Sequence, residues 1–350
     1  LTPLSSGREA ARGRGGGGGA LVPLWSPSHA LRVVDARNGS LTMATKHTLG
    51  WIGLGRMGYA MAYRMLHDGC ALTVWNRTRS KAEPLAEHGA TIATRIVDLA
   101  GCDIVFTNVS TTDDLKAVLF GKGGLLSTRT RPKLIVDSSS ISATGSAEIR
   151  ALCEKMKVQY LCAPVSGNAK VVKAGKLWTV ASGAKSAFQT AKPYLETWGR
   201  GVTYVGAGEL ARVWKIAHNT MFGVIIQSLC EITVLAEKAG IPRSVFLESI
   251  NNSVLGSMYT RYKSPALVNL DFAVTFTPKL LLKDMDLGMG AAKRLGVAMP
   301  AAAATRESIQ NMVGRGHDHV DFSILLVEMA RAAGMALKPE KKRVDDGLGG

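Results

Sequence analysis

Short apolar runs alternate with segments of helical periodicity between residues 48 and 205. The apolar runs are rich in β-branched and aromatic residues, and Gly, Ser, Asn and Asp cluster at their ends. Such alternation predicts an α/β fold with a doubly wound, mainly parallel sheet. The predicted strands are a short one from Thr48, then 71–75, 102–109, 133–140, 158–165, 177–182 and 202–205.

After residue 205 the alternation stops and helical patterns take over. A long helix over 209–239 is followed by one after Pro242 and by others at 278–295, 300–314 and 321–333. We therefore predict an all-helical second domain, joined to the first by the long helix. The predicted divisions are a disordered extension (1–43), the sheet domain (44–206), the helical domain (207–337) and a disordered tail (338–350).

The long helix is apolar nearly all round, which predicts burial on both sides. Lys215 and Asn219 stand four residues apart on its second face. A lysine is rarely buried without a partner, because removing its charge from water is costly. Spacing alone favours two readings equally: the side chain extends to solvent, or it lines a wet cleft between the domains.

Composition excludes several classes of protein. The 350 residues are 46% hydrophobic and 20% charged, with a net charge of +16, which indicates a globular protein that favours anionic ligands. No motif specifies nucleic acid, so we expect none as a partner. The five cysteines lack paired metal-ligand spacing, so we expect no metal and a reducing compartment. No uninterrupted apolar run is long enough for a membrane span.

Residues 1–42 combine a glycine run with arginine, serine and proline and show no hydrophobic period, which predicts disorder. They are poor in acids, as transit peptides are, but lack an amphipathic helix. Met43 looks like a natural start. We expect a soluble, cytoplasmic protein, or a mitochondrial one if 1–42 act as a transit segment.

The first strand runs into Gly53, Gly55 and Gly58, spaced G-x-G-x-x-G, and a helical pattern follows. In dinucleotide-binding units these glycines allow a tight turn, close approach of a pyrophosphate and close helix packing. The spacing alone is weak evidence, but the strand before it and the helix after it make it specific. We expect a nicotinamide dinucleotide to bind the loop residues Gly53, Leu54, Gly55, Arg56, Met57 and Gly58.

The end of the next strand favours NADP(H) over NAD(H). NAD sites carry an acidic residue there for the ribose 2′-hydroxyl, whereas this chain has Asn76, Arg77 and Thr78. An arginine beside a hydroxyl binds a 2′-phosphate by charge-assisted hydrogen bonds. The alternative is a solvated basic turn.

Six blocks occur in the order and spacing of the β-hydroxyacid dehydrogenase family, which the chain resembles from about Thr48 to Glu340. They are GWIGLGRMG, NRTRSK, VDSSSIS, APVSGNAKVVKAGKL, KIAHN and LLLKDMDLG. The resemblance implies a Rossmann-like cofactor domain and a helical domain for substrate binding and dimerisation. It implies that Lys215 is the catalytic lysine, with Asn219 beside it in the substrate site. It further implies a substrate carboxylate at Ser166, Gly167 and Asn168, and cofactor contacts at Val109, Ser110, Asp114, Ser140 and Lys283.

Several positions depart from the family pattern. Cys162 replaces an aspartate, Asn168 a glycine, Glu209 and Ala211 glycines, and His218 a common asparagine. We expect these changes to cluster near the substrate and to bear on its identity. His218 itself is expected to be a packed helix residue.

The resemblance and the lysine together predict hydride transfer between NADP(H) and a short 3-hydroxy or 2-hydroxy acid and its semialdehyde. A lysine can stabilise and protonate the alkoxide formed on reduction, and oxidation requires it to be neutral, through burial or a nearby cation such as Lys283. The alternatives are a reductase of another carbonyl or an imine, and a non-catalytic NADP-binding or nucleic-acid-associated protein. By resemblance we expect a small carboxylate substrate and a homodimer or homotetramer.

Overall fold

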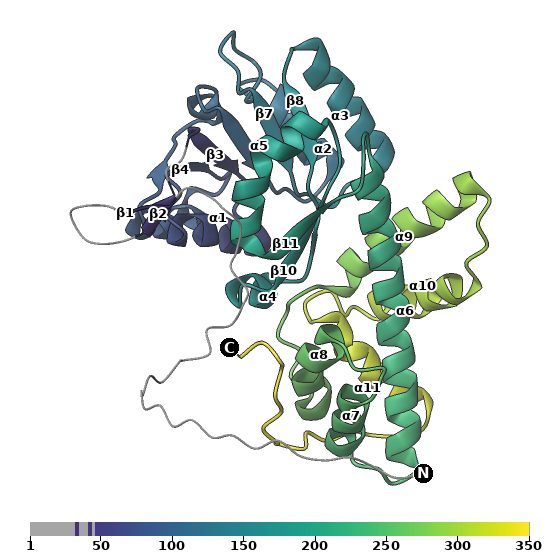
Figure 1. Cartoon of the computed structure of the whole chain (residues 1–350). Coiled ribbons are helices and arrows are strands. Elements are labelled where there is room, and N and C mark those ends of the chain that lie inside the picture. Colours follow the sequence, from purple (N-terminus) through teal and green to yellow (C-terminus); the bar gives the residue numbers. More distant parts are fainter. Residues whose placement is uncertain (1–31, 35–40, 44–45, 350) are drawn as a thin grey trace, which may run out of the picture. The chain divides into compact units, whose positions relative to one another are not determined.

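The structure, a computed structural model, describes residues 32–34, 41–43 and 46–349. A six-stranded parallel sheet in the order β5-β4-β3-β6-β7-β8 forms its first part (Figure 1). The strands are β3 (Leu49–Ile52), β4 (Leu72–Trp75), β5 (Thr91–Ile92), β6 (Ile104–Thr107), β7 (Leu134–Asp137) and β8 (Gln159–Cys162). The doubly wound sheet predicted from the alternation is confirmed.

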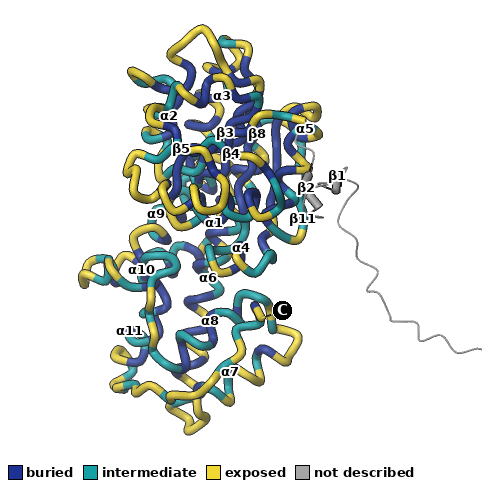
Figure 2. The backbone as a smooth tube through the Cα atoms, turned by 90° about the vertical axis from the view of Figure 1, so that its left-hand side faces the viewer, coloured by how far each residue is buried: buried dark blue, intermediate teal, exposed yellow. Residues whose placement is uncertain are grey.

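Helices cover both faces of this sheet, so successive strand side chains enter two separate cores. Phe106 packs with residues of α1 (Arg56–His67) and α5 (Lys185–Leu195). Its neighbour Val105 packs with residues of α2 (Thr112–Phe120) and α3 (Ala143–Lys155). Every residue of β3, β6 and β7 is buried (Figure 2). Burial on both faces explains why these strands are continuous apolar runs rather than alternating ones.

The strand order creates a crevice at one edge of the sheet. The chain runs outward from β3 through β4 to β5 and then returns to β6, on the other side of β3. Ligands of doubly wound sheets bind beyond the carboxyl ends of the strands at such a reversal. The glycine loop after β3 and the residues after β6 and β7 therefore border the same crevice.

The last three strands form a separate sheet instead of extending the first. β10 (Leu177–Ala181) pairs in parallel with β11 (Gly199–Tyr204) and antiparallel with β9 (Val165–Ser166). One isolated bridge, between Cys162 and Ser182, connects β8 to the chain that follows β10. The prediction of one run at 158–165 is thus corrected, since Ala163 and Pro164 separate β8 from β9.

A helical domain follows, and α6 (Leu210–Lys238) connects it to the sheets. The other helices are α7 (Arg243–Asn252), α8 (Met258–Asn269), α9 (Pro278–Leu295), α10 (Pro300–Gly314) and α11 (Leu325–Ala332). Helix α8 is the one that the sequence pattern did not predict. It contains Pro265 and only a weak apolar stripe, although Ser257 and Thr260 form a capping box at its start.

Among the described residues, α6 is covered on one side, by α7, α9, α10 and α11 and by contacts with β10 and α3. The prediction that α6 is buried on both sides is therefore wrong for the single chain. An exposed stripe remains along α6, formed by Leu210, Val213, Met221, Ile232 and Leu235. By length and composition α6 could cross a membrane, but 56% of its most apolar stretch is buried against other parts of the protein, as in a core helix.

Both terminal segments differ in part from the predicted disorder. β1 (Arg32–Val34) and β2 (Leu41–Met43) pair as an antiparallel hairpin inside the predicted extension, because their apolar and β-branched residues suit a strand. The rest of residues 1–43 lies outside the described residues. The tail over 338–349 packs on the helical domain, since buried Arg243 donates to the carbonyl of Lys338 and the Glu340 carboxylate accepts from the Ser244 amide.

Candidate active site

A cavity of about 220 Å³ lies where the sheet edge meets α6 and α8. Seven of the residues proposed from the sequence line it: Met57, Ser140, Ser166, Gly167, Asn168, Lys215 and Asn219. The sheet domain and the helical domain both contribute to the wall. The cavity agrees with the interpretation in which Lys215 lines a cleft between the domains.

The glycine loop has the geometry of a dinucleotide site. Gly53 has φ +94°, and a Cβ there would lie 2.3 Å from the carbonyl oxygen of Asn108, while a Cβ on Gly58 would lie 2.0 Å from the Gly53 carbonyl. At Gly55 a Cβ would meet nothing within 4 Å, so the space before the loop is open. No side chain caps α1, which leaves its first amides available for phosphate. These residues fit the pyrophosphate of a dinucleotide, with Leu54, Arg56 and Met57 between the glycines.

Asn76 and Arg77 have different roles at the end of β4. The Asn76 side chain accepts from the Leu54 amide at 2.8 Å and donates to the Thr78 carbonyl at 2.8 Å, so it braces the glycine loop. The Arg77 side chain is 86% exposed, and its ion pair with Asp114 is loose at 3.7 Å. Thr111 caps α2 by accepting from the Asp114 amide, and its hydroxyl donates to the Asp114 carboxylate. Arg77 is therefore free to turn toward an anion beyond the strand.

The segments after β6 and β7 are tied to each other and to α9. The Val109 amide donates to Ser139 Oγ at 2.9 Å, and Ser110 is exposed beside it. Lys283 Nζ donates to the Ser140 carbonyl at 3.0 Å, which places α9 against this edge. Asn108, which the sequence analysis did not single out, also lines the cavity and donates to Ser138.

The loop after β9 presents Ser166, Gly167 and Asn168 to the cavity. Gly167 has φ +133°, and a Cβ there would lie 2.8 Å from Val171 Cγ1, so a side chain would disturb the loop. The Asn168 side-chain oxygen caps α4 (Ala169–Lys173) by accepting from the Lys170 and Val171 amides. Asn168 thus supports the loop and leaves only its amide nitrogen for a ligand.

Lys215 lies against the same loop, because its Nζ donates to the Val165 carbonyl at 2.7 Å. The pKa of Lys215 is lowered from 10.5 to about 8, because burial lowers it more than Asp284 raises it and Lys283 adds to the lowering. The expected causes of a lowered pKa, burial and Lys283, are both present, and burial is the larger. Near neutral pH the amine can therefore act in both protonation states.

Asn219 belongs to a hydrogen-bonded chain that the sequence did not reveal. Its Nδ2 donates to Asp284 Oδ2 at 2.6 Å, and its Oδ1 lies 2.9 Å from His218 Nδ1. The other ring nitrogen of His218 lies 2.9 Å from Ser166 Oγ. His218 lines the cavity, so the expectation of a merely packed histidine is incomplete. Asp284 is buried, and only the fold brings it to the site.

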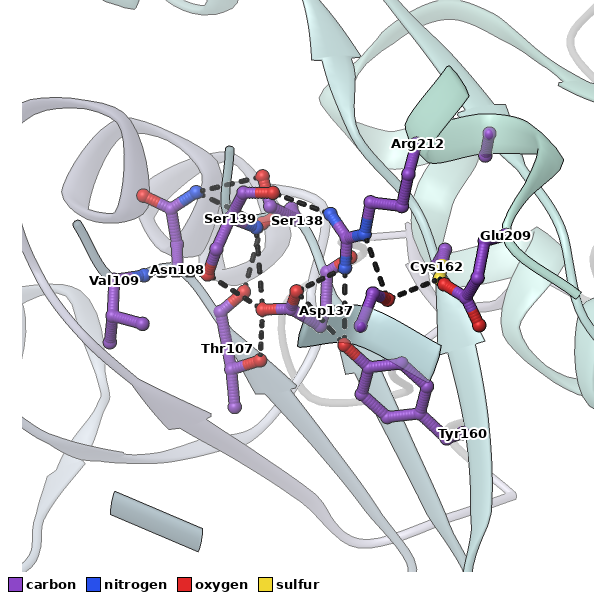
Figure 3. Close-up of polar contacts among 12 residues, drawn as sticks. Thr107, Asn108, Val109, Asp137, Ser138, Ser139, Tyr160, Cys162, Glu209 and Arg212 are labelled. Carbon is purple, nitrogen blue, oxygen red and sulfur yellow. Dashed lines mark hydrogen bonds and ion pairs between the residues drawn. The ribbon is translucent and has the colours of Figure 1, made fainter. Parts of the chain in front are cut away.

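A buried polar network, shown in Figure 3, fixes the start of α6 to the sheet edge. The Arg212 guanidinium pairs with the Asp137 carboxylate and donates to the Ser139 carbonyl, and both charged side chains are fully buried. Thr107 and Ser139 donate to the same carboxylate at 2.6 Å each. Because Arg212 precedes Lys215 by one turn, this network sets the position of the lysine relative to the edge.

The network also corrects the expectation that all family departures lie near the substrate. Cys162 Sγ donates to the Glu209 carboxylate at 3.1 Å, and Arg150 pairs with the same carboxylate at 2.6 Å. Neither Cys162 nor Glu209 lines the cavity, and Ala211 is buried in the core of the sheet domain. The carboxylate missing from position 162 is supplied from the start of α6. Only Asn168 and His218, among these departures, face the substrate space.

The remaining wall is mainly aromatic and comes from α8 and its neighbours. It is formed by Phe222, Tyr259, Tyr262, Phe276 and Phe322, with Lys263 among them. Lys263 is paired with Asp321 at 2.6 Å. The sequence analysis missed Tyr259, Tyr262 and Lys263 together with α8, although the capping box of α8 and the spacing of these three residues were available signals.

Comparisons with known proteins agree with this arrangement. Residues 48–206 match the NAD-binding domain of 6-phosphogluconate dehydrogenase, and residues 206–329 match the NAD-binding domain of NADP-dependent 3-hydroxyisobutyrate dehydrogenase. Glyoxylate/succinic semialdehyde reductase 2, chloroplastic, of Arabidopsis thaliana is 29% identical over 82% of this chain and 80% of its own. Probable 3-hydroxyisobutyrate dehydrogenase-like 3, mitochondrial, of the same plant is 30% identical over 83% of this chain and 90% of its own.

Among solved structures, a 3-hydroxyisobutyrate dehydrogenase from Salmonella typhimurium superimposes with a TM-score of 0.72 at 26% identity. The match covers 80% of this chain and 99% of that one. Both domains and the helix between them are therefore shared. With the glycine loop, the nicotinamide-dinucleotide fold and the cavity lysine in place, the chain belongs to the β-hydroxyacid dehydrogenase family of oxidoreductases.

Proposed function

We propose that the protein interconverts a short 3-hydroxy or 2-hydroxy acid and the matching semialdehyde with NADP(H) as cofactor. The observation that carries this proposal is the position of the Lys215 amine, which borders one cavity with Ser166, Gly167 and Asn219. The names of the relatives, which include semialdehyde reductases and 3-hydroxyisobutyrate dehydrogenases, support this substrate class.

Each residue has a chemical task in the proposed reaction. When bound, the nicotinamide donates or accepts the hydride. Protonated Lys215 stabilises and protonates the alkoxide that forms on reduction, and neutral Lys215 takes the hydroxyl proton on oxidation. Ser166 and the Gly167 amide hold the substrate carboxylate, while Asn219 uses its remaining amide hydrogen to orient the reacting oxygen.

The proposed preference for NADP(H) rests on Arg77. Its side chain is exposed and only loosely paired, and no acid stands at the end of β4 to hold a 2′-hydroxyl. Replacing it, as Arg77→Asp, removes the cation and adds a repulsive charge, so NADPH affinity should fall at least about tenfold relative to NADH. The ratio of the two dissociation constants, measured by cofactor fluorescence, tests this, and an unchanged ratio would contradict the proposal.

The reaction is tested by NADPH oxidation with a panel of semialdehydes, ketoacids and imines. Lys215→Ala should lower kcat by about 10²–10⁴-fold, because a general acid is lost. Lys238→Ala is the matched control, since Lys238 lies on the same helix and also donates to a backbone carbonyl, but at the exposed far end. Turnover that is insensitive to Lys215→Ala would refute the mechanism.

The aromatic wall favours a second candidate, a reductase of a bulkier carbonyl compound or an imine. The Phe222, Tyr259 and Phe276 side chains offer apolar contact rather than charge. The same panel separates the two, because an imine reductase would act on substrates without a carboxylate. Dinucleotide binding without any turnover would instead point to a non-catalytic protein.

A further inference from the structure

The chain of hydrogen bonds that begins at Asp284 determines where the protons lie. A carboxylate can only accept, so Asn219 must turn its amide nitrogen toward Asp284 and donate one of its two hydrogens there. The Asn219 carbonyl oxygen then faces His218 Nδ1, which must carry a hydrogen to bond at 2.9 Å. A neutral imidazole has one donor and one acceptor nitrogen, so Nε2 of His218 accepts and Ser166 donates to it.

This direction leaves Ser166 in the wrong state for a carboxylate. Its single proton points at His218, and only oxygen lone pairs face the cavity. A substrate carboxylate also has only lone pairs to offer, so the two would repel each other. Reversing the imidazole tautomer would not help, because Nδ1 would then face the Asn219 oxygen without a hydrogen, and Asn219 cannot turn without facing Asp284 with that oxygen.

Protonation of the His218 ring removes the repulsion between Ser166 and a substrate carboxylate. With hydrogens on both nitrogens, His218 still donates to Asn219 and now also donates to Ser166 Oγ, which frees the serine hydroxyl to donate to a carboxylate. One proton is taken from solvent to form the Nε2–H bond, no other covalent bond is made or broken, and the hydrogen bond between His218 and Ser166 reverses its direction. We propose that His218 takes up a proton when a carboxylate binds at Ser166 and Gly167, so that this histidine selects substrates that carry a carboxylate. The inference rests on the proposed function.

The charges that face the ring agree with uptake on binding rather than before it. In the ligand-free protein burial and then Lys215 lower the pKa of His218, while the bond to Asn219 raises it. Lys283 and Asp284 on α9 are paired with each other, and Lys263 on α8 is paired with Asp321. A substrate carboxylate adds a negative charge at Ser166 that has no counterpart in the free site. The Trp214 ring, stacked 4.9 Å from His218, can also stabilise an imidazolium.

The identity of residue 218 explains why this chain can couple substrate binding to proton uptake. His218 stands where an asparagine is common in the family, and an asparagine could bond to Ser166 but could not change its charge. His218→Asn is therefore the matched variant, because it keeps a polar side chain there without a titratable group. His218 acts here as a positioning residue for the serine, distinct from Lys215, which acts on the reacting oxygen.

Calorimetry on the NADPH-bound protein tests the inference. 3-Hydroxypropionate is titrated in buffers of different ionisation enthalpy, because a hydroxy acid and reduced cofactor can bind together but cannot react. The wild type should take up about one proton more per ligand than His218→Asn at a pH above the free histidine pKa. Its affinity for the acid should fall by up to about tenfold per pH unit there, and the variant should lack that slope.

A kinetic comparison separates this effect from titration of Lys215. KM for succinic semialdehyde should rise with pH in the wild type but not in His218→Asn, whereas KM for butanal, which has no carboxylate, should show no such difference. Equal proton uptake by both proteins overturns the inference and leaves the proposed function standing. If no hydroxy acid binds and no semialdehyde is reduced, the inference and the proposed function fail together.

Discussion

Replacing the two charges beside Lys215 should move the pH dependence of the reaction in opposite directions. Asp284 raises the pKa of Lys215 and Lys283 lowers it, although burial is the largest cause. Asp284→Asn removes the anion but keeps an oxygen that can accept from Asn219, so the lysine should lose its proton at lower pH. Lys283→Gln removes the cation, so the lysine should keep its proton to higher pH.

The size of the effect follows from the shift itself. The pKa of Lys215 falls from 10.5 to about 8, a difference of about 2.5 pH units. At pH 8 about half of the lysine is then neutral, whereas an unshifted lysine would be neutral in about one molecule in 300, so oxidation gains about 150-fold. Since burial dominates, each variant should move the midpoint by less than the full 2.5 units.

The assay is kcat for oxidation of the hydroxy acid at saturating concentration across pH, so that the effect of His218 on substrate binding does not enter. The wild type should gain activity through a midpoint near pH 8, because oxidation needs the neutral amine. Reduction, which needs the charged amine, should lose activity through the same midpoint. Asp286→Asn serves as a control, since Asp286 lies on the same helix but is exposed and paired with Arg306. A wild-type midpoint near 10.5, or movement of both variants in one direction, would refute this account.

Three further predictions concern the framework. Arg212→Met removes the ion-pair partner of the buried Asp137. The free energy of unfolding, measured by urea denaturation, should fall by about 3–5 kcal/mol. A loss below about 1 kcal/mol would contradict the role of the network. Gly167→Ala places a Cβ 2.8 Å from Val171 Cγ1 and so disturbs the loop after β9. KM for the hydroxy acid should rise while the affinity for NADPH stays the same. A matching loss of NADPH affinity would indicate general unfolding instead. We propose that a homodimer or homotetramer covers the exposed stripe of α6. Met221, which is 64% exposed, lies in that stripe, so a charge introduced by Met221→Glu should yield monomers in sedimentation. An unchanged sedimentation coefficient would show that no subunit covers the stripe.

Local patterns predicted most of the fold because the apolar positions of most strands and helices already show which of their faces are buried. The strands β3, β6 and β7 are apolar because both faces are covered, and α9 and α10 begin and end where their patterns do. Helix α8 was not predicted because its burial depends on contacts with distant segments and because Pro265 interrupts its apolar pattern. Tyr259 and Tyr262, which α8 contributes to the aromatic wall of the cavity, were missed with it.

Site residues could be predicted where a motif requires a particular backbone conformation. They were harder to predict where side chains from distant parts of the chain meet. The positions of Gly53 and Gly58 follow from the loop itself. The bond between Asn219 and Asp284 joins residues 65 positions apart, and no local signal announces it. For the same reason the departures at Cys162 and Glu209 were assigned to the substrate region, although their contact lies behind it.

The exchange of a carboxylate between positions 162 and 209 also has an evolutionary consequence. Arg150 needs one carboxylate partner, which Glu209 provides at 2.6 Å. An acid at both positions would crowd two negative charges into that space, and an acid at neither would leave the arginine with neutral partners such as the carbonyls of Tyr160 and Gly208. Each single change should therefore cost more stability than the double change. Sequences that carry arginine at 150 should therefore vary at these two positions in concert, and either substitution transplanted alone into a relative should harm it.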